Sequence, residues 1–118
     1  MDKMKIYEDE RGRIIDVADM KFESVQIIES KAGTVRSNHY HKKGGHLLHI
    51  LSGSMIYSEI PVNKGEGKIV IYNAGESVFT GPMLIHRTYF PEDTVMICCS
   101  TLKRGNGGYN RDLVRVEI

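Results

Sequence analysis

Short runs of apolar and β-branched residues, separated by turn residues, extend along the whole chain. The apolar positions lack the spacing of three to four residues that marks an amphipathic helix. Gly, Asn, Asp and Pro cluster between the runs, which is the pattern of many short strands. We therefore predict an all-β fold, a sandwich or barrel, formed by residues 1–118 as a single domain. The predicted strands cover residues 4–7, 13–17, 24–30, 34–38, 46–51, 54–60, 68–73, 77–80, 86–90, 94–100 and 113–117.

Composition narrows the classes of function. The chain has 118 residues, 41% of them hydrophobic, with 16 basic and 15 acidic side chains. A domain of this size needs neither disulfides nor a structural metal to fold, so the adjacent Cys98 and Cys99 are expected to be reduced structural thiols. A near-neutral chain without runs of like charge has no basis for binding nucleic acid. No apolar run approaches the roughly 20 residues that cross a bilayer, and the N-terminus has no apolar signal segment. We expect a cytoplasmic protein without a membrane partner.

Five histidines lie between residues 39 and 86, and four of them are expected to share one site. His39 and His41 are two residues apart, so on a strand they project from the same face toward one point. His46 follows the turn at 42–45 and His86 begins a later predicted strand, so both can face the same interior. His49 is three residues from His46, which places it on the opposite face. Four neutral imidazoles at His39, His41, His46 and His86 suit a divalent transition metal such as Fe, Zn, Mn, Ni or Cu.

The spacing of glycines and histidines resembles the two motifs of the cupin superfamily. The first motif covers residues 33–53 as Gly-x5-His-x-His-x4-His-x6-Gly, and the second covers residues 75–90. The resemblance implies a double-stranded β-helix, or jelly-roll barrel. The motif positions are Gly33, His39, His41, His46 and Gly53, followed by Gly75, Pro82 and His86.

Several positions depart from the cupin pattern. His46 stands where cupins usually carry glutamate, and Met83 stands in place of the second glycine of motif two. Pro82 is one position late, and Phe90 replaces the trailing asparagine. Four neutral histidines would leave the full charge of a divalent metal uncompensated, which favours an anionic ligand and makes the metal a stronger Lewis acid.

A narrower resemblance involves residues 36–43, Arg-Ser-Asn-His-Tyr-His-Lys-Lys. The pattern Arg-x-x-His-x-His-Lys is similar to that of cupins of bacterial cell-surface sugar biosynthesis, including dTDP-sugar ketoisomerases and dTDP-4-dehydrorhamnose 3,5-epimerases. In those proteins the first histidine abstracts a proton next to a ketone and no metal is used. The resemblance therefore implies a catalytic base at His39.

Three hypotheses remain open from the sequence. The first is a metal cupin whose four histidines hold a divalent ion that binds a small oxygen-bearing ligand, anionic or sugar-like ligands included. The second is a metal-independent sugar-nucleotide isomerase or epimerase, with His39 as base and His41, Tyr57 or Tyr89 returning the proton. The third is a cupin that binds a small molecule without turnover.

Arg36 is the candidate for binding a phosphate or sugar oxygen of the substrate, because its planar guanidinium suits such groups. It is three residues from His39, so its side chain belongs to the other face of the strand unless the strand bulges. Leading and trailing strands leave sheet edges that a second subunit commonly covers, so we expect a homodimer.

Overall fold

The computed structural model describes residues 5–63, 65–103 and 111–115, and in these residues the chain is almost entirely β-structure. The all-β prediction is confirmed. No helix in the described part is long and apolar enough to cross a membrane. The strands are β1 (Lys5–Asp9), β2 (Gly12–Asp16), β3 (Ser24–Ser30), β4 (Thr34–His41), β5 (His46–Ser52), β6 (Ser54–Pro61), β7 (Lys68–Asn73), β8 (Ser77–Thr80), β9 (Leu84–Phe90), β10 (Thr94–Ser100) and β11 (Leu113–Arg115).

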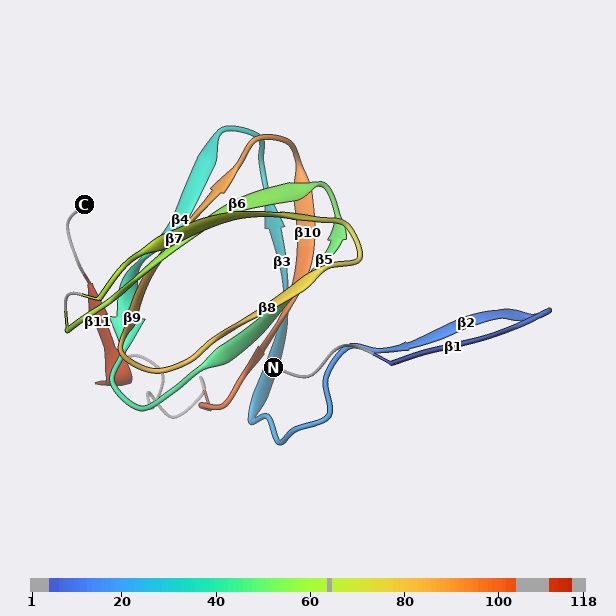
Figure 1. Ribbon diagram of the computed structural model, residues 1–118, viewed down its shortest axis with the longest axis horizontal. Coiled ribbons are helices and arrows are strands. Elements are labelled where there is room, and N and C mark those ends of the chain that lie inside the picture. The colour runs from blue at the N-terminus through green and yellow to red at the C-terminus, as the bar shows by residue number, and fades with distance from the viewer. Residues whose placement is uncertain (1–4, 64, 104–110, 116–118) are drawn as a thin grey trace.

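Two antiparallel sheets face each other and enclose a barrel (Figure 1). One sheet has the strand order β3-β10-β5-β8, and the other has the order β11-β4-β9-β6-β7. Strands from distant parts of the sequence are neighbours in both sheets, for example β3 beside β10 and β4 beside β9. The trailing strand β11 pairs with β4 of its own chain and forms one edge of the larger sheet.

Strand boundaries differ from the prediction where the site lies. β4 extends through Asn38 to His41, and β9 begins at Leu84, two residues before His86. Residues 38–41 are polar, so the sequence pattern did not predict that the strand continues through them. Pairing with β9 on one side and β11 on the other stabilises this part of β4. The predicted strands 4–7 and 113–117 include residues 4 and 116–117, which lie outside the described part.

One end of the barrel interior is apolar. Alternate residues of five strands point inward there, and none of their side chains is more than 7% exposed. Gly53 of motif one sits at this end with a φ of 88°, and an added Cβ would lie 2.4 Å from a Thr94 oxygen, so only glycine fits. The buried core consists of Leu48, Ile50, Met55, Tyr57, Val78, Phe90, Met96 and Cys98.

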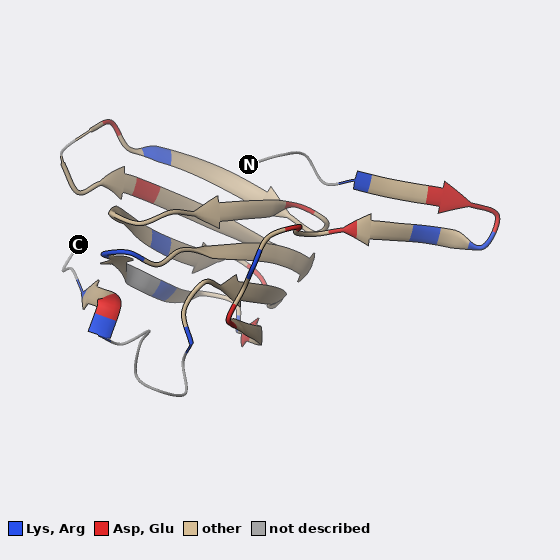
Figure 2. Ribbon diagram, turned by 90° about the horizontal axis from the view of Figure 1, so that it is seen from below, with Lys and Arg blue, Asp and Glu red and all other residues tan. Residues whose placement is uncertain are grey.

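The hairpin formed by β1 and β2 is separate from the barrel. The two strands pair with each other over five residue pairs, and they pair with no other strand of the described residues. Figures 1 and 2 show the hairpin projecting away from the two sheets. We call residues Lys5–Asp16 the arm.

Candidate functional site

Four histidine rings gather at the end of the barrel opposite the apolar core. The ring centroid of His39 lies 5.1 Å from that of His41 and 4.6 Å from that of His86. The His46 centroid lies 4.9 Å from that of His86 and 6.0 Å from that of His41. All four residues are buried. The structure thus brings together the four histidines that the spacing selected.

The rings meet because their strands are neighbours. His39 and His86 are register partners on β4 and β9, and His41 is two residues further along the same face of β4. His46 opens β5 in the facing sheet and has Thr80 and Ser100 as its partners. His49 lies on the other face of β5, where its Nδ1 is 2.6 Å from the hydroxyl of Ser77. The exclusion of His49 from the cluster agrees with this position.

Asp112 is a site residue that the sequence did not reveal. It lies directly before β11, and its carboxylate accepts hydrogen bonds from the backbone N–H groups of Lys43 (2.9 Å) and Gly44 (2.7 Å). It therefore holds the turn between His41 and His46. One of its oxygens is also 3.6 Å from Nδ1 of His41. A distance of 71 residues in sequence separates Asp112 from His41, and no local pattern marks the contact.

The protonation of His86 follows from its hydrogen bond. Its Nδ1 lies 3.2 Å from the carbonyl oxygen of Leu84, which can only accept, so Nδ1 carries the hydrogen. Nε2 is then an unprotonated nitrogen, and it is buried without a hydrogen-bond partner among the described residues. Burial lowers the pKa of His86 from 6.5 to about 4, with a smaller contribution from His41 in the same direction. His86 is therefore a neutral imidazole at physiological pH.

The prediction of a metal ion rests on the donor set rather than on the observed geometry. Four imidazoles are chemically suited to a transition metal, and the tautomer of His86 leaves Nε2 as a donor. Nevertheless, three or more His, Cys, Asp or Glu side chains arranged to hold a metal ion are not found within residues 5–63, 65–103 and 111–115. Neighbouring ring planes lie at 79–86° to one another in four of the contacts between these histidines.

A second polar cluster adjoins the histidines on β6. The hydroxyl of Tyr57 donates to the carboxylate of Glu59 (2.6 Å) and lies 2.6 Å from the hydroxyl of Thr80. Burial and the carboxylate of Glu59 raise the pKa of Tyr57 strongly. Glu59 is the register partner of His86 and forms an ion pair with Lys68 at 3.3 Å. Glu59 was missed by the sequence analysis, although its spacing of two from Tyr57 places both on one face.

The two candidate tyrosines occupy different positions. Tyr57 faces the interior, and its hydroxyl is committed to Glu59 and Thr80, so it supports the site from within. Tyr89 lies between the buried inward residues Thr88 and Phe90, and it pairs with Val35 and Ile56 on the outer face of the sheet. Tyr89 is therefore not placed to return the proton, as the sequence had suggested, because the alternation of β9 directs its side chain outward.

Arg36 shares the inner face with His39 because β4 bulges. The register shifts between Ser37 and His39, so that Arg36 pairs with Thr88 and His39 pairs with His86, both of which point inward. The guanidinium of Arg36 donates from Nε to the Ser30 hydroxyl (2.9 Å) and from Nη2 to a carbonyl of β3 (3.0 Å). Arg36 therefore bridges the two sheets and is exposed to solvent.

Met83 occupies a strained backbone position beside the histidines. Its φ is 60°, and it is the residue that stands in place of a motif glycine. Its N–H donates to the carbonyl of His41 (2.7 Å) and its carbonyl accepts from Val62 (3.1 Å), so the backbone is held on both sides. A non-glycine residue in this region costs about 1–2 kcal/mol.

Replacing Met83 by glycine is expected to raise the free energy of unfolding by about 0.5–1 kcal/mol. The relief of strain exceeds the entropy that glycine adds to the unfolded chain, and the exposed Met83 side chain contributes little packing. Urea unfolding at neutral pH measures the change. Met83→Ala keeps the strain and serves as the control, with no gain expected, and a gain equal to that of Met83→Gly would show that strain is not the cause.

The paired sheets and the glycine and histidine motifs define the class of protein: the chain has the cupin fold, a small jelly-roll barrel. No protein-family model and no curated protein matches the chain. Solved structures do, among them the sugar 3,4-ketoisomerase QdtA from Thermoanaerobacterium thermosaccharolyticum in complex with TDP, with a TM-score of 0.78 and 21% identity over 96% of this chain and 84% of that one.

Two further structures show the range of proteins with this fold. The 3,5-epimerase RmlC from Legionella pneumophila, in complex with dTDP-4-keto-L-rhamnose, has a TM-score of 0.77 and 18% identity, covering 97% of this chain and 70% of that one. The capsular polysaccharide assembling protein CapF from Staphylococcus aureus has a TM-score of 0.72 and 19% identity, and this chain spans 34% of its length. At such identities the similarity establishes the fold.

Proposed function

We propose that the protein is a cytoplasmic isomerase or epimerase of nucleotide-linked keto-sugars. The observation that carries the proposal is the pair of adjacent imidazoles of His39 and His41, whose ring centroids lie 5.1 Å apart. The carboxylate of Asp112 lies next to the ring of His41. Such a pair can remove a proton from carbon and return one to carbon. The ligands of the similar structures, TDP and dTDP-4-keto-L-rhamnose, support the substrate class.

His39 takes the proton in this mechanism. The C–H bond next to the substrate ketone breaks, its electron pair forms the C=C bond of an enediolate, and the carbonyl oxygen takes the negative charge. A neutral imidazole is suited to this step at neutral pH.

His41 returns the proton. With the Asp112 carboxylate 3.6 Å from its Nδ1, His41 donates to the opposite face of the same carbon, or to the neighbouring carbon while the hydroxyl proton of the enediolate passes to the other oxygen. The new C–H bond consumes the enediolate, and no oxidant or reductant is needed. His86 stays neutral at physiological pH, which keeps a second positive charge away from His39.

Supporting residues complete the assignment. Tyr57 is a positioning residue, since its hydroxyl is committed to Glu59 and Thr80. Arg36, which is exposed and held by Ser30 and Glu29, binds the diphosphate of the substrate through its guanidinium group.

The test is solvent exchange. The purified protein is incubated in D2O with dTDP-keto-sugars, and NMR and mass spectrometry follow deuterium at the carbon next to the ketone. Incorporation with a change of keto position or of configuration supports the proposal. A complete absence of exchange across a panel of 4-keto and 3-keto sugars would refute it.

A second candidate function is a metal cupin, and the tautomer of His86 favours it. The Nδ1–H of His86 donates to a backbone carbonyl, as in metal-bound histidines, and leaves Nε2 as a donor. His39, His41 and His46 would supply the other imidazoles. The metal would polarise a ligand oxygen when bound.

Elemental analysis separates the two candidates. For protein purified without a metal-affinity tag, we expect well below one equivalent of transition metal, and we expect exchange activity to survive treatment with a chelator. Near-stoichiometric metal that is lost in His86→Ala and retained in His49→Gln would favour the metal cupin instead.

The proposal includes a homodimer. The trailing strand β11 is paired within its own chain, whereas the arm pairs with no strand of the barrel in the described residues. An isolated two-stranded hairpin is marginally stable in water, so the arm requires a surface to cover it.

A further inference from the structure

We propose that Arg115 is a catalytic residue, whose guanidinium binds the substrate oxygen on which negative charge develops when His39 takes the proton. This inference rests on the proposed function and adds a residue to its site. His39 and His41 move the proton, but neither of them holds the oxygen of the enediolate. Stabilising such charge is usually the largest single contribution to catalysis, so the site requires a group for it.

A row of ionisable side chains crosses the inner face of the five-stranded sheet from edge to edge. Its members, each the register partner of the next, are Lys68, Glu59, His86, His39 and Arg115. Register partners in an antiparallel sheet point to the same side, with Cβ atoms about 4.5–5.5 Å apart. Arg115 therefore points to the side of the sheet on which the ring of His39 lies, and it is the neighbour of this base.

The position of β11 places Arg115 at the rim of the histidine cluster. β11 is the edge of the sheet, and it pairs with β4 alone among the described strands (Figure 1). His39 is 7% exposed, whereas Arg115 is exposed to solvent. A substrate that enters at this edge meets the guanidinium and the base next to each other.

Two other cations on the inner face are held by protein groups. The Lys68 ammonium lies 3.3 Å from the Glu59 carboxylate, at the opposite edge of the sheet from β11. Arg36 donates to the Ser30 hydroxyl and to the carbonyl of Glu29, and its assigned ligand is the diphosphate. Neither of these cations is the neighbour of the base in the row.

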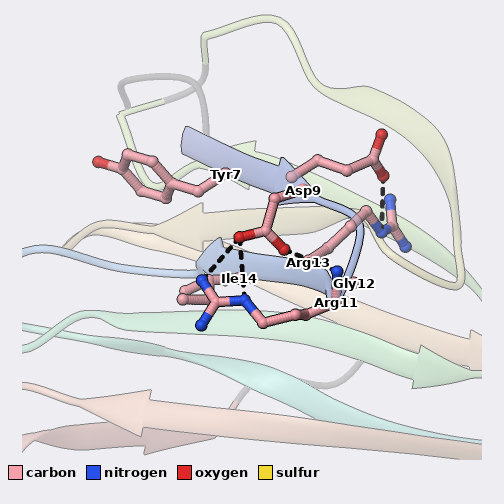
Figure 3. A pocket seen from close by; sticks show the side chains of 7 residues that line it. Tyr7, Asp9, Arg11, Gly12, Arg13 and Ile14 are labelled. Carbon is pink, nitrogen blue, oxygen red and sulfur yellow. Dashed lines mark hydrogen bonds and ion pairs between the residues drawn. The ribbon is translucent and has the colours of Figure 1, made fainter.

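The arginines of the arm are paired as well. Arg11 lies 2.7 Å from the Asp9 carboxylate and Arg13 lies 3.9 Å from that of Glu8, on a hairpin that projects away from the barrel (Figure 3). By contrast, the guanidinium of Arg115 forms no hydrogen bond or ion pair with another residue of the described part of the chain. Its N–H groups are therefore available to a ligand beside the base.

The charge that Arg115 stabilises appears and disappears within one cycle. As the C–H bond breaks, its proton goes to His39, its electron pair forms the C=C bond, and the carbonyl π electrons move to the oxygen. That oxygen accepts an N–H of Arg115. When His41 returns a proton to carbon, the C=C electron pair forms the new C–H bond and the carbonyl is restored. Arg115 transfers no proton and acts through its charge.

The test is the kinetics of Arg115→Met with a dTDP-keto-sugar. We expect kcat and the rate of deuterium exchange to fall about 10²–10³-fold, the usual cost of removing one donor to a developing oxyanion. Arg115→Lys keeps the positive charge and should lose less. Arg87→Met is the matched control, because Arg87 is exposed between the buried His86 and Thr88 and so lies on the outer face of β9. Its kinetics should equal those of wild type.

Binding of dTDP alone separates this role from that of a diphosphate ligand. Calorimetry should give Arg115→Met the Kd of wild type for dTDP, because this ligand has no ketone on which charge develops. The loss should therefore lie in kcat and not in ground-state binding.

The outcomes distinguish this inference from the proposed function. An unchanged kcat in Arg115→Met, or equal losses in Arg115→Met and Arg115→Lys, would overturn the role of Arg115 and leave the isomerase intact. Weaker binding of dTDP with an unchanged kcat would also overturn it, because Arg115 would then bind the diphosphate. A wild-type protein that exchanges deuterium with no keto-sugar would overturn the proposed function, and the role of Arg115 with it.

Discussion

Replacing His39 by alanine is expected to reduce kcat/KM for the dTDP-keto-sugar by about 10²–10⁴-fold, the usual contribution of a positioned general base. Deuterium incorporation next to the ketone should fall by the same factor, because the variant lacks the group that takes the proton. His39 contacts His41 and His86 through its ring, so its removal also leaves a gap in the cluster. His39→Gln, which is closer in volume, should show the same loss.

The matched control is His49→Gln. His49 is also a buried histidine of the barrel, but it lies on the outer side of β5 and contacts Ser77. Its activity should equal that of wild type. Equal losses in His39→Gln and His49→Gln would mean that the effect comes from destabilised folding and would remove the assignment of His39 as base.

Lowering the pH from 6.5 to 4 is expected to cost the protein about 3 kcal/mol of stability through His86 alone. Burial lowers the pKa of His86 from 6.5 in the unfolded chain to about 4 in the folded protein. Between these values the unfolded chain binds a proton that the folded protein does not, so the free energy of unfolding falls as the pH falls. Above pH 6.5 both states are neutral at this residue and the contribution is constant. Burial lowers the pKa of His49 as well, so His49 also makes the free energy of unfolding fall as the pH falls.

Urea unfolding at a series of pH values measures this dependence. His86→Asn removes the titrating group, so its stability should fall less steeply than that of wild type between pH 6.5 and 4. Parallel curves for the two proteins would show that His86 is not the buried neutral histidine described above.

Much of the fold was accessible from local pattern. The runs of apolar residues located most of the strands, since each strand buries one face and its sequence alternates accordingly. Gly33, Gly53 and Gly75 adopt positive φ, which explains why the motifs require glycine at these turns. The boundary of β4 was missed because its end is polar and depends on pairing with two other strands.

The sequence predicted the site only in part, again because contacts between distant strands leave no local sequence pattern. The spacing of His39 and His41 predicted a shared face, and alternation correctly excluded His49, because both inferences involve one strand. The sequence did not predict that a bulge in β4 places Arg36 on the inner face, or that Tyr89 lies on the outer face. Both positions depend on the register between neighbouring strands. Asp112 lies against His41, and Glu59 is the register partner of His86. Both pairs join residues that are far apart in the sequence, so no short sequence pattern predicts them.

The sequence by itself determined the all-β class, the glycine turns and the four histidines that can meet, since each of these depends on residues a few positions apart. Only the tertiary structure decided which carboxylate stands behind His41, which tautomer His86 adopts, and that the leading strands form an arm rather than a barrel edge. These features depend on packing and hydrogen bonding between segments distant in the chain, and that information is not present in any short stretch of it.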